Sequence, residues 1–64
     1  MELPDEERGK IAWVLAQLRA RDEAELPGAL DLARAARQLL KQAGEAHTPM
    51  RTAVEAWLAE HEPG

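Results

Sequence analysis

Residue types that could carry catalytic chemistry are scarce in this chain. Serine and cysteine are absent, so the side-chain hydroxyl nucleophiles are Thr48 and Thr52. Neither threonine has a base beside it to activate it, and the four glycines are too scattered to form a phosphate-binding loop. We therefore expect a protein without enzymatic activity and without a cofactor.

The two histidines are the remaining candidates for metal chemistry. His47 precedes the last predicted helix and His61 lies on its final turn, so about 20 Å of helix separates them at the standard rise. Two ligands so far apart cannot hold one metal ion within a single copy of the chain. No recognised ligand spacing surrounds either histidine, and we expect no metal site.

The composition favours helices as the elements that position these residues. The chain has 64 residues, of which 45% are hydrophobic, mostly Ala and Leu, and its aromatic residues are two tryptophans. Ala and Leu are strong helix formers, and β-branched residues are too few for a sheet. This length predicts a single domain. We expect an all-α fold.

Location can also be predicted from the sequence. No apolar run approaches the ~20 residues that a membrane span needs. The first ten residues are acidic and polar, unlike a secretory signal, and cysteine is absent. We expect a cytoplasmic protein without a membrane partner.

Turn and capping residues divide the chain into helices over about 5–23, 28–43 and 49–61. Pro27 suits either a turn or the first position of the second helix. Gly44 is the expected left-handed residue after that helix, and Thr48 is the expected cap of the third. Three helices with short connections predict a small three-helix bundle.

One apolar face from each helix forms the predicted core. In the first helix this face is the row at the i, i+3, i+4, i+7 spacing. The complete predicted core is Ile11, Val14, Leu15, Leu18, Leu32, Ala36, Leu39, Leu40, Met50, Val54, Trp57 and Leu58.

Trp13 points about 160° away from that row, at roughly 100° per residue. It shares the opposite face with small residues, and a chain this short cannot easily cover both faces. Trp is the residue type most enriched at binding hot spots. We therefore expect binding of another protein chain, either a partner helix or a second copy in a homodimer. The predicted contact residues are Gly9, Trp13, Ala16, Gln17 and Ala20. The alternative is that the Trp13 ring packs inside its own bundle.

A basic middle segment supports a second hypothesis. Residues 27–44 carry a net charge of +2, between two segments of −3. The second helix, the Gly44 turn and the third helix, over residues 33–60, resemble the helix-turn-helix of repressor-type proteins, with 52–58 as the second helix. The ten-residue step from Gly44 to Val54 is longer than in that family. The resemblance implies binding of DNA or RNA phosphates through Arg34, Arg37, Lys41 and Arg51.

Overall fold

The chain folds as an all-α three-helix bundle, which confirms the predicted fold class. The computed structural model describes residues 3–62. The helices are α1 (Asp5–Arg19), α2 (Leu26–Ala43) and α3 (Thr48–His61). Two short 3₁₀ turns connect them, η1 (Glu23–Glu25) and η2 (Glu45–His47).

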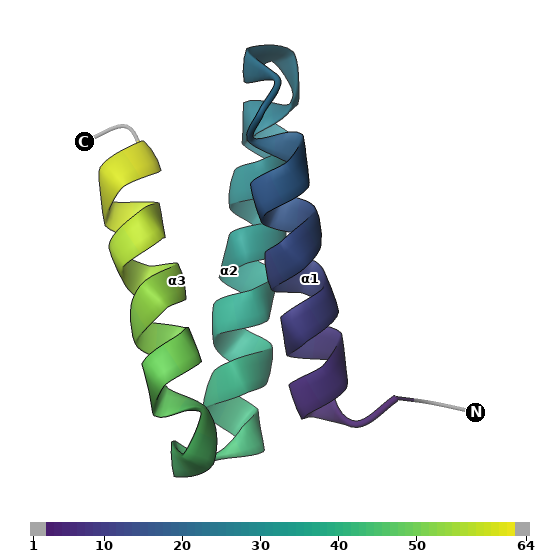
Figure 1. Ribbon diagram of the computed structural model, residues 1–64, viewed down its shortest axis with the longest axis vertical. Coiled ribbons are helices and arrows are strands. Elements are labelled where there is room, and N and C mark those ends of the chain that lie inside the picture. Colours follow the sequence, from purple (N-terminus) through teal and green to yellow (C-terminus); the bar gives the residue numbers. More distant parts are fainter. Residues whose placement is uncertain (1–2, 63–64) are drawn as a thin grey trace.

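The bundle is flat rather than round. Its Cα atoms extend over 31 × 26 × 13 Å, so the shortest dimension is half of the next one. Figure 1 shows α2 between the other two helices, antiparallel to both, with α3 diverging from α2 toward its C-terminal end. The α1–α2 contact is the more extensive one. A flat arrangement leaves each outer helix with one face that no other helix covers.

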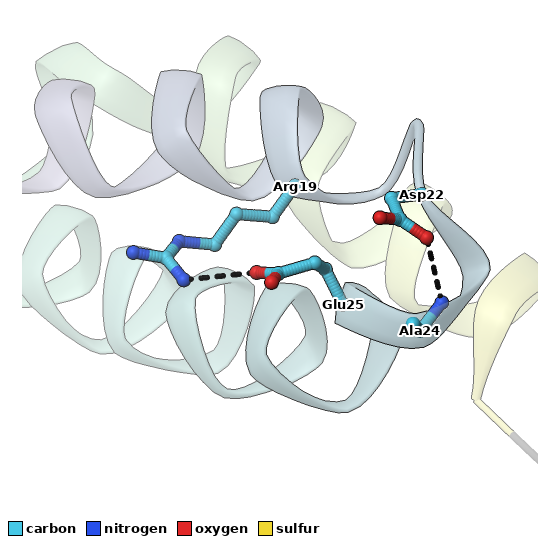
Figure 2. A network of polar contacts seen from close by, with 4 residues as sticks. All are labelled: Arg19, Asp22, Ala24 and Glu25. Carbon is cyan, nitrogen blue, oxygen red and sulfur yellow. Dashed lines mark hydrogen bonds and ion pairs between the residues drawn. The ribbon is translucent and has the colours of Figure 1, made fainter.

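The end of α1 is set by Asp22. Its carboxylate Oδ1 accepts a hydrogen bond from the Ala24 backbone N–H at 3.0 Å, and its backbone is extended. Figure 2 shows this turn beside the ion pair between Arg19 and Glu25, at 3.1 Å. Because Asp22 bonds the backbone locally, it offers the chain an alternative to another helical turn. The helix consequently ends at Arg19, four residues before the expected end at 23.

In the connection between α2 and α3, the positive φ predicted for Gly44 is present, and the side-chain cap predicted for Thr48 is absent. Gly44 has a φ of +108°, the positive value expected of the residue after α2. Thr48, however, makes no capping hydrogen bond through its side chain. It lies inside α3, and its backbone N–H donates to the Glu45 carbonyl of η2. The 3₁₀ turn runs directly into the helix, so the backbone takes the role that we assigned to the hydroxyl.

The core lies between α2 and the inner faces of its two neighbours. Predicted residues of α2 and α3 are confirmed there: Ala36, Leu40, Val54 and Leu58 are buried, and Leu32, Met50 and Trp57 pack against them. Further buried residues, outside the predicted core list, are Gly9, Ala12, Ala16, Ala29, Leu30 and Ala33.

The predicted orientation of α1 is wrong. The row assigned to the core faces outward, with exposed fractions of 46% for Ile11, 54% for Val14, 38% for Leu15 and 51% for Leu18. The opposite face, with its small residues and its tryptophan, packs against α2 and α3. Relative to the prediction, α1 is therefore rotated by about half a turn around its own axis.

Candidate protein-interaction surface

A close helix–helix contact explains why α1 turns its small residues inward. A Cβ added at Gly9 would lie 3.0 Å from both Cγ and Cδ2 of Leu40. Ala12 and Ala16 continue the same face, and α2 opposes them with buried alanines of its own. The separation of two packed helices depends on the side chains at the contact. Two small-residue faces therefore let α1 approach α2 closely.

Trp13 fills the space that this approach leaves beside α3. Its ring centroid lies 5.9 Å from that of Trp57, with the planes at 83°. Trp57 in turn stacks on His61, at 4.2 Å and 20°. The Nδ1–H of His61 donates to the Trp57 carbonyl at 2.8 Å. Half-buried rings thus bridge the outer helices, and the first tryptophan does not point outward.

These contacts change the status of the predicted partner-binding residues. Gly9 and Ala16 are buried against α2, and Ala20 is half-buried. Trp13 is also half-buried and packs on the core, so it is not available as the anchor for a partner. Of the five, Gln17 alone is exposed. The face that we predicted to bind a partner is therefore the buried face of α1. The apolar row that we predicted to be buried is the exposed face.

The outer face of α1 now carries the exposed apolar surface. We call it the α1 stripe; it consists of Ile11, Val14, Leu15 and Leu18. A shallow groove of about 260 Å³ runs along it, lined by Lys10 and the first three stripe residues. The sequence signal was the i, i+3, i+4, i+7 spacing itself, which marks an apolar face but does not say what covers it.

The structure brings together three of the four predicted phosphate-binding residues. Arg37 and Lys41 of α2 and Arg51 of α3 line one groove of about 430 Å³, together with Gln38 and Glu55. The Arg51 Nε lies 3.4 Å from a Glu55 carboxylate oxygen and makes no hydrogen bond.

Arg34 lies apart from that groove. Its guanidinium is 3.3 Å from Asp31 and 3.6 Å from Glu62. The exposed carboxylates hold it near the C-terminal end of α3, so it belongs to a different part of the surface.

Neither histidine is near the other. The His47 Nε2 lies 2.8 Å from a Glu6 carboxylate oxygen, and this contact joins η2 to the start of α1. His61 closes the core edge at the other end of α3. Over residues 3–62, no group of three or more His, Asp or Glu side chains could hold a metal ion. In the same range no helix is both long and apolar enough to cross a membrane.

No protein-family model matches this chain, and neither a curated protein nor a solved structure matches it.

Proposed function

We propose that this protein is a non-catalytic interaction module that binds a helical segment of another protein through the α1 stripe. The observation that carries the proposal is the exposure of four large apolar side chains in one continuous row on a single helix. Singly scattered apolar residues are normal on a protein surface, whereas a contiguous apolar patch commonly marks an interaction site.

The shape of the stripe suits a helical partner. Its residues follow one face of α1 over about 10 Å, and the adjoining groove is shallow and apolar. An amphipathic helix places its own anchors at i, i+3, i+4 and i+7, and it can lie along such a row. The same stripe could instead take a second copy of this chain. A docking, regulatory or inhibitory role in the cytoplasm is compatible with this proposal.

A displayed library of helical peptides, selected on the purified chain, tests the proposal. We expect enrichment of peptides that carry the four-anchor apolar spacing. The double variant Val14→Ser/Leu18→Ser should lose this enrichment while keeping its helical circular dichroism. A matched variant on exposed positions of α3, Ala56→Ser/Ala59→Ser, should keep it. No enrichment, or enrichment that survives the stripe variant, would contradict the proposal.

A second candidate function is binding of nucleic-acid phosphates in the groove of Arg37, Lys41 and Arg51. The convergence of three cations from two helices favours it, and the carboxylate of Glu55 in the same groove opposes it. Three phosphate contacts predict an affinity for duplex DNA that falls about fortyfold between 50 and 200 mM salt. The variant Arg37→Ala should weaken binding, and Arg34→Ala should not. Absence of binding to labelled duplex at 50 mM salt removes this candidate.

A further inference from the structure

The α1 stripe lies in the longer of two extended stretches of the chain that are free of acidic residues, 8–21 and 32–44. Residues 8–21 contain Arg8, Lys10, Arg19 and Arg21 and no Asp or Glu. The rest of the chain has 12 acidic and four basic side chains. The apolar row therefore sits in a locally cationic segment of an acidic protein.

The cations border the stripe on both sides. At about 100° per residue, Arg8 and Arg19 lie along one edge of the row and Lys10 along the other. Lys10 also lines the groove beside the stripe. Arg21 follows the helix in the exposed turn.

Three of these cations form exposed ion pairs with carboxylates of the same chain. Asp5 and Glu7 lie 4.0 Å from Arg8 and Lys10, and Glu25 lies 3.1 Å from Arg19. All six side chains are about half-exposed. Such surface pairs contribute little and exchange readily, so the cations remain able to pair with a partner.

A second copy of the chain is a poor occupant of this surface. An antiparallel pair that sets Ile11 against Leu18 and Val14 against Leu15 covers the stripe completely. Two antiparallel copies bring the same edge of each helix together, so Arg8 of each copy would lie beside Arg19 of the other and like charges would meet along that edge. Like charges directly opposite each other are destabilising. A stable dimer also buries about 800 Å² per partner, close to 18% of this chain's 4467 Å². A stripe one helix wide does not offer that area.

A lipid surface is likewise a poor occupant. Anionic lipid would attract the four cations, but a flat membrane would also meet the acids at the two ends of the stripe. Glu7 lies one turn before Ile11, and exposed Glu23 and Glu25 follow the far end. A partner helix that extends no further along α1 than the row avoids both groups.

We infer that the partner is an amphipathic helix with an apolar row and with Asp or Glu along both flanks. This inference rests on the proposed function and adds the chemistry of the partner to it. The apolar row would cover the stripe, and the flanking carboxylates would accept hydrogen bonds from Arg8, Lys10 and Arg19.

Three labelled helical peptides test the inference by fluorescence anisotropy on the full chain. They share one apolar row and differ in their flanking residues, which are Glu, Gln or Lys. We expect the Glu peptide to bind about tenfold more tightly than the Gln peptide, from several rim pairs of modest strength. The Lys peptide should bind most weakly. The advantage of Glu should shrink between 50 and 300 mM salt because the pairs are exposed.

Chain variants separate the contributions of charge and apolar contact. Arg8→Gln/Arg19→Gln should remove most of the advantage of the Glu peptide over the Gln peptide and leave the part that Lys10 supplies. Arg37→Gln removes a cation from α2, away from the stripe, and should not change the affinity for any of the three peptides. Val14→Ser/Leu18→Ser should abolish binding of every peptide. Support requires all of these differences together.

Each contrary outcome has a distinct meaning. Equal binding of the Glu and Gln peptides overturns the acidic partner and leaves the proposed function standing. No binding of any peptide overturns both. Concentration-dependent dimerisation in sedimentation, lost in Val14→Ser/Leu18→Ser, overturns the partner in favour of a second copy. Stripe-dependent binding to vesicles of phosphatidylserine and phosphatidylcholine that exceeds peptide binding overturns it in favour of lipid.

Discussion

The indole rings of Trp13 and Trp57 meet edge to face, with centroids 5.9 Å apart and planes at 83°. This is a favourable geometry for an aromatic pair, in which the positive edge of one ring meets the negative face of the other. The contact joins α1 to α3, two helices that otherwise meet chiefly through α2. The orientation of α1, and therefore the exposure of the stripe, depends on this pair.

Truncation of Trp13 should destabilise the fold. The variant Trp13→Ala removes a half-buried ring that packs on the core, and we expect a loss of about 2–4 kcal/mol in the free energy of unfolding. Leu18→Ala removes an exposed side chain of the same helix and should change that free energy by no more than about 0.5 kcal/mol. Urea denaturation followed by circular dichroism measures both. Equal losses would mean that the stripe contributes to the core after all.

The sequence predicted α2 and α3 better than α1, for a physical reason. On α2 and α3 the large apolar residues define one clear face, and Leu40, Val54 and Leu58 are buried as predicted. On α1 two apolar faces compete, one with four branched side chains and the other with Trp13 among small residues. Spacing identifies both faces but does not decide between them. The decision lies in the partner helix, because the alanines of α2 accept a close neighbour.

Gly9→Ala should destabilise the protein even though alanine is the better helix former. The new Cβ would lie 3.0 Å from two atoms of Leu40, whose side chain is fully buried and has little room to move. We expect a net loss of about 1–2 kcal/mol, since overpacking exceeds the gain in helix propensity.

The matched control for that substitution is Gly28→Ala. A Cβ at Gly28 would meet nothing within 4 Å, and Gly28 lies in the first turn of α2 without a positive φ. We expect a gain of about 0.5 kcal/mol in the free energy of unfolding. A stabilising Gly9→Ala, measured beside this control, would show that α1 does not pack closely on Leu40.

Asp22 should contribute more to the stability of the fold than its exposed position indicates. The variant Asp22→Ala removes the acceptor of the Ala24 N–H, and we expect a loss of about 1 kcal/mol, as for other side chains that satisfy a free backbone donor. Glu23→Ala, one residue later, makes no such bond and serves as the control. Thermal unfolding of both variants distinguishes the two sites. Equal midpoints would indicate that the turn forms without the carboxylate.

The candidate sites show a second limit of sequence reasoning. Arg34, Arg37 and Lys41 share the polar face of α2, and the spacing alone groups them. Position along the helix separates them in the fold, because Arg34 pairs with Glu62 while the other two line a groove together with Arg51. Such long-range pairings follow from how α3 lies against α2, and no local pattern encodes them.

The pair of Glu6 and His47 should couple the start of α1 to the α2–α3 connection. The two side chains come from distant parts of the sequence and meet at 2.8 Å, and the His47 side chain is only 18% exposed. A double-mutant cycle with Glu6→Gln and His47→Gln isolates their interaction from each residue's other contacts. We expect a coupling of about 0.5–1 kcal/mol, above that of a freely exposed pair because His47 is shielded from water. The matched cycle on Asp5 and Arg8, neighbours on one helix at 4.0 Å, should give a smaller value. A coupling near zero for Glu6 and His47 would mean that this pair does not hold the N-terminal turn of α1 against η2, and that the orientation of the stripe depends on the packing of α1 on α2 and on the Trp13–Trp57 pair.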